Sequence, residues 1–236
     1  MNLDEFCKGF RALSVERPDV PRSYEAGKKL LGELLRDPAW FGDFLQRYIS
    51  GPAFLTEEPA SVFDNEIRIH RSPDKSFTLL AYIWDKPDLC PVHDHSAWGL
   101  IGPLLNPLRE VKYRRTDDGN AEGFAELERV SEFLLKPGEV GFVLPLDKGI
   151  HQTGAAKDGI TISLGVYGRS IRKGYIHFFK PEEKKITRAR MRIPFRRVLA
   201  LRALASVGEA VGKTLLTSSL LDPLPKDWVR EFRASS

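Results

Sequence analysis

The chain has 236 residues, of which 42% are hydrophobic and 29% are charged, which is ordinary for a globular protein and allows one barrel domain with additions. The formal net charge of +4 favours acidic partners only mildly, and the two cysteines, Cys7 and Cys90, are too few for a disulfide framework. There is no apolar run of about 18 residues, and Asp4 and Glu5 are not followed by the hydrophobic region of a signal peptide. We therefore expect a cytoplasmic protein, with neither nucleic acid nor a membrane as a partner.

The N-terminal part of the chain has the pattern of helices. Leucines recur with helical spacing between Leu30 and Leu35. Asp37 followed by Pro38 is typical of the start of a second helix, with the aspartate as its cap and the proline in its first turn. Residues 1–55 are therefore predicted to form a helical segment.

From about residue 60 to residue 180 the pattern is that of β-strands. Short runs rich in Val, Ile, Phe and Tyr alternate with turn residues, and no long helix separates them, which is typical of a sandwich or a barrel. Residues 117–120 (DDGN) are typical of a hairpin turn. We predict one barrel domain over residues 56–182. The expected strands are residues 76–84, 108–114, 124–135, 140–144 and 160–167.

The last part of the chain is basic. Residues 180–233 hold 13 Lys or Arg against 6 Asp or Glu. Pro194 is expected to open a helix, and apolar residues at helical spacing follow it from Leu204 to Leu215. We interpret residues 183–236 as a basic helical extension that is packed on the barrel and has a solvated outer face. The alternative is a surface that binds an anionic partner.

The main chemical signal is in residues 91–95 (PVHDH). Residues two apart on a strand face the same side, so His93 and His95 are expected to point into the barrel and Asp94 away from it. Two imidazoles held in this way can bind one metal, and neutral imidazole suits iron, zinc, copper and nickel. Alone this pattern is weak, because two polar strand residues that face solvent have the same spacing.

A second segment adds a third histidine. Residues 138–145 (GEVGFVLP) combine a glycine turn, a strand and a proline turn, and His151 follows Gly149 by two positions. The two segments resemble the two motifs of the cupins, His-x-His in the first and Gly…Pro…Gly-x-His in the second. The resemblance implies a mainly β fold, a double-stranded β-helix (jelly-roll) barrel with N- and C-terminal helical extensions. It also implies that His93, His95 and His151 are metal ligands.

The ligand set follows from an absence in the first motif. Many cupins place a glutamate four or five residues after the second histidine, where this chain has Gly99 and Leu100, and residues 96–102 contain no carboxylate. The resemblance therefore implies three neutral histidines in place of two histidines and a carboxylate. Three protein ligands leave positions for an anionic ligand and for dioxygen.

Residues 91–102 (PVHDHSAWGLIG) also resemble the bacterial thiol dioxygenases, the relatives of cysteine dioxygenase and 3-mercaptopropionate dioxygenase. Trp84, Trp98 and Gly99 add to this similarity, which covers roughly residues 60–180. It implies that the protein binds iron(II) and oxidises a small thiol to a sulfinate with both atoms of O₂. Trp98 is expected to lie beside the substrate.

The first departure from this family concerns a late strand. Family members place Ser, His and Tyr at alternate positions there, and these side chains form a hydrogen-bonded relay near the iron. The matching positions here are Ser163, Gly165 and Tyr167, so Ser163 and Tyr167 are the expected catalytic residues. Gly165 interrupts the relay. Three explanations stay open: Tyr167 acts through water, the gap admits a larger substrate, or thiol chemistry has been lost.

The second departure concerns the arginine that holds the substrate carboxylate. In animal cysteine dioxygenases it precedes the first motif, and a count without gaps from His93 reaches Ile67. The adjacent Arg68 would face the other way unless the strand register shifts. Arg169 and Arg172 are alternatives, because mercaptopropionate-type enzymes use an arginine downstream of the tyrosine. A substrate other than cysteine is therefore favoured.

Three functions are compatible with these patterns. The first is an iron thiol dioxygenase with a small-molecule thiol as its partner. The second is a metal-dependent cupin with other, non-thiol chemistry, which Gly165 favours. The third is a non-catalytic cupin sensor whose basic extension binds a partner. A homodimer is compatible with all three.

Overall fold

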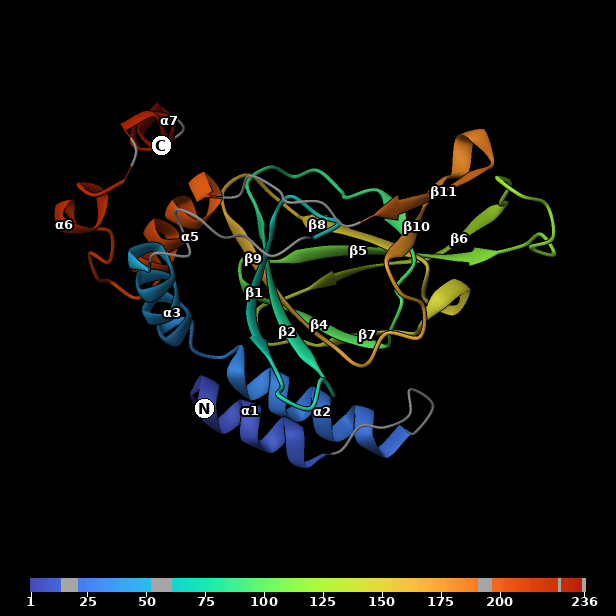
Figure 1. Cartoon of the computed structure of the whole chain (residues 1–236), viewed down its shortest axis with the longest axis horizontal. Helices are drawn as coiled ribbons and strands as arrows, with labels where there is room; N and C mark the ends of the chain where they lie inside the picture. Colours follow the sequence, from blue (N-terminus) through green and yellow to red (C-terminus); the bar gives the residue numbers. More distant parts are fainter. Residues whose placement is uncertain (14–20, 52–60, 191–196, 225, 235–236) are drawn as a thin grey trace.

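The computed structural model describes residues 1–13, 21–51, 61–190, 197–224 and 226–234. In this part of the chain, strands form two antiparallel sheets, and helices from both ends of the sequence lie against one side of them (Figure 1). The strands are β1 (Glu66–Arg71), β2 (Thr78–Trp84), β3 (Val92–His93), β4 (Gly99–Leu105), β5 (Leu108–Arg115), β6 (Leu127–Leu135), β7 (Gly141–Val143), β8 (His151–Ala155), β9 (Thr161–Tyr167), β10 (Tyr175–Lys180) and β11 (Lys185–Arg190). The helices are α1 (Leu3–Ala12), α2 (Pro21–Leu34), α3 (Ala39–Ser50), α5 (Arg197–Ala210), α6 (Ser218–Leu221) and α7 (Lys226–Ala234), with 3-10 turns η1 (Leu146–Gly149) and η2 (Pro181–Glu183).

The strand pairing shows how the barrel is wound. One sheet has the order β1-β2-β9-β4-β7 and the other has the order β11-β10-β3-β8-β5-β6. β5 and β6 form a hairpin, whose two arms are the chain that precedes β5 and the chain that follows β6. Farther from the hairpin turn, strands of the two arms continue to pair: β4 with β7, β3 with β8 and β2 with β9. The two arms therefore cross together from one sheet to the other. This winding is a double-stranded β-helix, so the predicted jelly-roll barrel with helical extensions is confirmed.

The largest core lies between the helices and the outer face of the five-stranded sheet. Strand alternation sends Leu79, Ala81 and Ile83 of β2 to this face, while Tyr82 and Trp84 belong to the cluster inside the barrel. Buried residues of α1, α2, α3 and α5 pack against the outer face, so both extensions share one core with the barrel (Figure 1). None of the described helices is long and apolar enough to cross a membrane.

The helix starts follow from local hydrogen bonds. α1 begins with a capping box, in which Asn2 and Glu5 each accept the other's backbone N–H. α3 begins at Ala39, one residue later than predicted, although the carboxylate of Asp37 accepts the Ala39 N–H at 2.9 Å. The predicted helix start at Pro194 lies outside the described residues.

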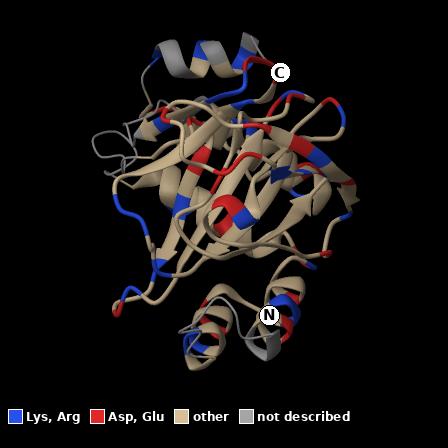
Figure 2. Ribbon diagram, turned by 90° about the vertical axis from the view of Figure 1, so that its right-hand side faces the viewer, with Lys and Arg blue, Asp and Glu red and all other residues tan. Residues whose placement is uncertain are grey.

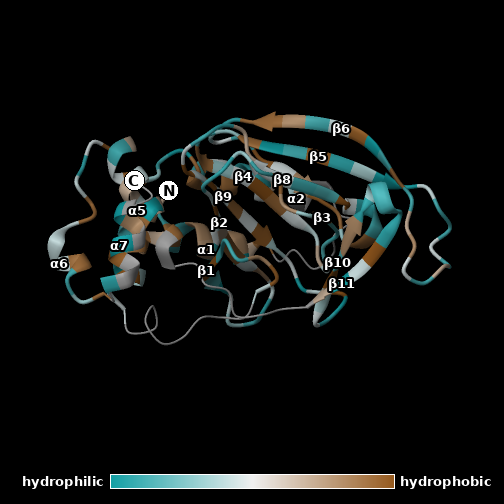
Figure 3. Cartoon of the chain, turned by 90° about the horizontal axis from the view of Figure 1, so that it is seen from above, coloured by the Kyte–Doolittle hydropathy of each residue, from teal (hydrophilic) through white to brown (hydrophobic). Residues whose placement is uncertain are grey.

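The sheet continues beyond the predicted barrel limit of residue 182, because β11 pairs with β10 along its whole length. At the opposite edge of the same sheet, β6 exposes Val130, Phe133 and Leu134. Figure 3 shows hydrophobic and hydrophilic residues side by side on this strand. Charged neighbours on an edge strand oppose unwanted pairing with other chains. In the view of Figure 2, basic and acidic residues are intermingled over the barrel.

Candidate metal centre

Two strands bring the three predicted histidines together between the sheets. His93 ends β3 and His151 begins β8, and the two residues are direct partners in the antiparallel pairing. His95 lies two residues farther on and faces the same cavity. His93, His95 and His151 are 3%, 8% and 3% exposed, and their candidate ligand atoms all lie within 4.8 Å of one another. The group can therefore hold one metal ion, as predicted.

Hydrogen bonds fix which imidazole nitrogens carry hydrogen. His93 Nδ1 lies 2.8 Å from the Pro91 carbonyl oxygen, and His151 Nδ1 lies 2.8 Å from Glu110 Oε1. Both oxygens accept hydrogen bonds, so both Nδ1 atoms donate and both Nε2 atoms keep a lone pair. His95 Nε2, 2.8 Å from His151 Nε2, is then the donor between these two rings. A metal ion would replace this shared hydrogen and meet neutral nitrogen ligands.

Burial keeps two of these histidines neutral. It lowers the pKa of His93 to about 3, with a smaller contribution from nearby His151. Burial also lowers the pKa of His95 well below its ordinary value, and the neighbouring imidazoles add to this effect. Metal ligands must be deprotonated, so protons compete little with a metal for these nitrogens near neutral pH.

We expect the metal-free protein to lose stability as the pH falls from about 6.5 towards 3. In the folded state His93 has a pKa of about 3, whereas in the unfolded chain a histidine binds its proton near pH 6.5. Acid therefore favours the unfolded state, by up to about 1.4 kcal/mol per pH unit for this group, and above pH ~6.5 the contribution is constant. Urea unfolding with chelator present checks this. His93→Gln should reduce the slope, and a free energy of unfolding that does not change with pH would contradict the prediction.

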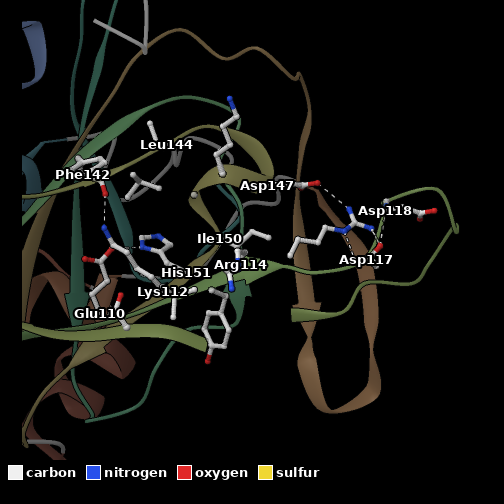
Figure 4. Close-up of a pocket in the computed structure, with 18 residues that line it drawn as sticks. Glu110, Lys112, Arg114, Asp117, Asp118, Phe142, Leu144, Asp147, Ile150 and His151 are labelled. Carbon is white, nitrogen blue, oxygen red and sulfur yellow. Dashed lines mark hydrogen bonds and ion pairs between the residues drawn. The ribbon is translucent and has the colours of Figure 1, made fainter. Parts of the chain in front are cut away.

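Behind His151 lies a carboxylate that was not expected in the site. Glu110 is 1% exposed, accepts the His151 Nδ1–H, and lies 3.8 Å from the ammonium of Lys112. Lys112 also donates to the Phe142 carbonyl oxygen at 3.0 Å (Figure 4). Because Glu110 holds the ring nitrogen that faces away from the other histidines, it orients His151 without belonging to the ligand set itself.

A groove of ≈ 670 Å³ reaches this side of His151 from the surface (Figure 4). Its outer part is lined by paired charges, since Arg115 binds both Asp117 and Asp147. Phe142 and Lys112 lie nearer the histidine, and the lysine is over the phenylalanine ring, 4.9 Å from its centre. The groove therefore gives solvent access to the Glu110 side of the centre.

The cavity that contains all three histidines is much smaller. Its volume is ≈ 20 Å³, which is enough for about one water molecule. Ser163 and Tyr167, the two expected catalytic residues, both line it. The other lining residues are mainly apolar or aromatic: Phe63, Tyr82, Trp84, Cys90, Ile101, Leu108 and Thr153.

Tyr167 fills the space left by Gly165. Its ring stacks on His95 with centres 5.1 Å apart. A Cβ atom on Gly165 would lie 2.5 Å from Tyr167 Cε2, and one on Gly99, across the β4–β9 pair, would lie 2.7 Å from Cδ1. The expectation that the gap admits a larger substrate is therefore wrong, because the tyrosine ring already occupies it. The Tyr167 hydroxyl hydrogen-bonds Tyr82, and burial raises its pKa.

We expect Gly165→Ala to destabilise the protein by about 1–3 kcal/mol, because the added methyl group collides with a ring packed between two strands. Displacement of Tyr167 should also change its stacking on His95. Urea unfolding and near-ultraviolet circular dichroism measure the two effects. Gly9→Ala is the matched control, since its Cβ would meet Leu30 at an ordinary 3.5 Å. An unchanged Gly165→Ala variant would show that the ring has room to move.

Ser163 and Cys90 have partners that limit their roles. Ser163 Oγ accepts the Trp84 indole N–H at 3.1 Å, which fixes the hydroxyl in the cavity wall. Cys90 Sγ lies 3.6 Å from His93 Nδ1, and burial raises the pKa of the thiol to about 11. Cys90 is therefore protonated near neutral pH and does not belong to the ligand set.

Trp98 does not lie beside the metal centre, contrary to the prediction. It is 3% exposed and packs against the N-terminal helices, with its ring 6.3 Å from that of Phe10 and 5.9 Å from that of Tyr24. The reason is strand alternation, because Gly99 faces the barrel interior and its neighbour Trp98 must face the helices. Trp98 is a core residue.

The three candidate arginines are in different environments. Arg172 pairs with buried Asp94 and also donates to the Tyr175 carbonyl oxygen, so it anchors the loop that follows β9. Arg169 is exposed and donates to the Asp74 carbonyl oxygen. Of the three, only Arg68 lines a hollow that also contains His95 and Tyr167.

Comparison with known proteins gives only partial likenesses. No protein-family model matches the chain. Among solved structures it is similar to a cupin-like protein from Thermotoga maritima, at 13% identity over 44% of this chain and 66% of that chain, with a TM-score of 0.32. It is also similar to the DMSP lyase DddQ from Ruegeria pomeroyi, at 13% identity over 52% of each chain and a TM-score of 0.33. Oxalate decarboxylase from Bacillus subtilis matches at 14% identity over 40% of this chain and 22% of that chain, with a TM-score of 0.30. The chain thus spans about half the length of the lyase and less of the decarboxylase.

Proposed function

We propose that this protein is an iron(II)-dependent dioxygenase that oxidises a small thiol to a sulfinate. The observation that carries the proposal is the donor set. Three buried histidines converge, no carboxylate of the described residues belongs to their group, and Glu110 supports one of them from behind. Neutral nitrogen ligands suit iron(II). Because they carry no charge, the ion keeps its full positive charge, which favours the binding of a thiolate.

The overall reaction is RSH + O₂ → RSO₂H. The O–O bond breaks, two S–O bonds form, sulfur is oxidised by four electrons, and O₂ accepts them. Bound iron(II) supplies the redox chemistry that allows O₂ to react with the sulfur. His93, His95 and His151 would hold the ion, and the sulfinic acid formed releases its proton to solvent.

The protein's own residues bind and orient the reactants. Tyr167 presents its hydroxyl at the cavity, where Tyr82 holds it by a hydrogen bond, and Ser163 lies in the same wall. Ile101 and Leu108 keep this wall apolar, which limits the access of bulk water to the reacting sulfur. Arg68 lines the neighbouring hollow, where its guanidinium would bind a substrate carboxylate.

A second candidate is a metal-dependent cupin with non-thiol chemistry. Gly165 favours it, because the Ser-x-His-x-Tyr relay of thiol dioxygenases is absent and Tyr167 bonds Tyr82 instead. On this alternative the centre would bind iron or another metal, and no thiol would enter the coordination of that metal.

The test is anaerobic. Iron(II)-loaded protein is exposed to nitric oxide, and its EPR spectrum is recorded with and without a panel of small thiols. The proposal predicts a thiol-dependent change in the iron–nitrosyl signal, together with O₂ consumption equal to sulfinate formed. Cys90→Ser is the matched control, because Cys90 is the protein thiol nearest the histidines. A nitrosyl signal that no thiol alters would favour the second candidate.

A further inference from the structure

The hollow that contains Arg68 borders the metal cavity. It has a volume of ≈ 430 Å³ and is lined in part by residues of β1. β1 is the edge strand of the five-stranded sheet (Figure 1). The hollow and the metal cavity share Phe63, Tyr82, His95 and Tyr167 in their walls. A molecule whose reacting atom reaches the histidines from this side would have the rest of its structure in this hollow, which we call the β1 groove.

A β-bulge in β1 places a second arginine in the β1 groove. Arg68 pairs with Leu80, but the next partners are His70 with Leu79 and Arg71 with Thr78, so Ile69 is an extra residue. Without the bulge, Arg71 would face the helices. With it, Arg68 and Arg71 share the side of Leu80 and Thr78, and both line the groove.

His70, one of the two residues between the arginines, confirms this geometry. His70 faces the other way, towards the helices, with its ring 5.5 Å from that of buried Phe77. Ile67 is also buried in the helix-facing core. The strand therefore sends Ile67 and His70 outward, and sends Arg68 and Arg71 to the groove.

The groove is electrostatically suited to anions. Within the described residues, neither Arg68 nor Arg71 has an ion pair or a side-chain hydrogen bond. Glu66 is the one carboxylate among the described lining residues, and it hydrogen-bonds the Tyr82 hydroxyl. Two guanidinium groups without partners, on one side of one strand, can each bind a carboxylate through two parallel hydrogen bonds.

We propose that the substrate is a thiol that carries two carboxylates, one bound by Arg68 and the other by Arg71. This inference rests on the thiol chemistry proposed above. The volume of the groove supports it, because ≈ 430 Å³ is in the usual range for small-molecule sites and exceeds the needs of a three-carbon thiol acid. Specificity for the second carboxylate would come from Arg71.

Two thiols that differ by a single carboxylate test the proposal. Mercaptosuccinate is 3-mercaptopropionate with a second carboxylate on the carbon that bears sulfur. The iron-loaded protein should oxidise mercaptosuccinate with a kcat/KM about tenfold or more above that for 3-mercaptopropionate. The reason is that 3-mercaptopropionate lacks the second carboxylate and therefore cannot make the charge-assisted hydrogen bond to Arg71. Arg71→Gln should remove this preference, by lowering kcat/KM for mercaptosuccinate towards that for 3-mercaptopropionate. Arg169→Gln, at an exposed arginine outside the groove, should preserve the preference.

A binding measurement separates this inference from the function on which it rests. Calorimetry on the metal-free protein compares succinate with butyrate, which have the same carbon chain and differ in one carboxylate. Succinate should bind about tenfold more tightly, and Arg71→Gln should abolish the difference. Equal binding of the two acids, or equal oxidation of the two thiols, would overturn the inference and leave thiol oxidation standing. Selective succinate binding without any thiol oxidation would instead overturn the proposed function and keep the dicarboxylate site.

Discussion

Replacement of His95 by alanine is expected to weaken iron(II) binding by about a hundredfold or more, because one of three ligands is lost and structural metal sites owe about 3 kcal/mol to each ligand. The barrel should stay folded, since among the described residues the His95 side chain hydrogen-bonds only His151 and stacks on Tyr167, while the backbone bond from Leu146 to the His95 carbonyl is kept. Competition titration of iron(II) against a chelator of known affinity measures the loss.

The control for this variant is His70→Ala. His70 is a partly buried histidine that packs against Phe77 on the helix side of β1. Its replacement should leave iron(II) affinity unchanged and affect only stability. If His95→Ala bound iron(II) as tightly as the unaltered protein, the three-histidine centre would not be the metal site.

The histidines could be predicted from the sequence because their placement depends on local rules. His93 and His95 are two residues apart, so any strand or extended segment sends them to one side. His151 follows a glycine and proline pattern that ends one strand and starts the next. The barrel winding then makes His93 and His151 direct partners.

The errors concern features that local spacing does not encode. Trp98 was expected near the substrate, but Gly99 takes the inward position on β4, and Trp98 packs on Phe10 of a helix far away in the sequence. β4 itself was missed because Gly102 and Pro103 interrupt its strand pattern, although all but its last residue are buried. Burial on both faces of a central strand replaces the alternation on which strand prediction depends.

The remaining features of the site depend on the register between strands, which local spacing in the sequence does not give. The bulge at Ile69 in β1 allows Arg68 and Arg71 to face the groove together, and a count without gaps cannot reveal a bulge. The gap at Gly165 is closed because β4 brings Gly99 opposite Tyr167. Glu110 reaches His151 for the same reason, since β5 lies beside β8 with Lys112 opposite the histidine.

Replacement of Glu110, the carboxylate behind His151, is expected to weaken metal binding and to destabilise the fold. Glu110→Ala should lower metal affinity by about 10- to 100-fold, because His151 loses the carboxylate that orients its ring. It should also lower the free energy of unfolding by about 1–3 kcal/mol, because the buried His151 Nδ1–H loses its acceptor. Chelator competition and urea unfolding measure the two losses.

Glu110→Gln separates orientation from charge. The amide oxygen can still accept the His151 Nδ1–H, so stability should be largely retained, but the negative charge beside Lys112 is gone. If charge matters, metal affinity should fall nearly as far as in Glu110→Ala. If orientation alone matters, Glu110→Gln should bind metal almost normally. Glu128→Gln, which removes an exposed partner of Arg114 on the same hairpin, should change neither property by more than a surface ion pair contributes. Normal metal affinity in both Glu110 variants would show that the carboxylate serves the fold and not the metal centre.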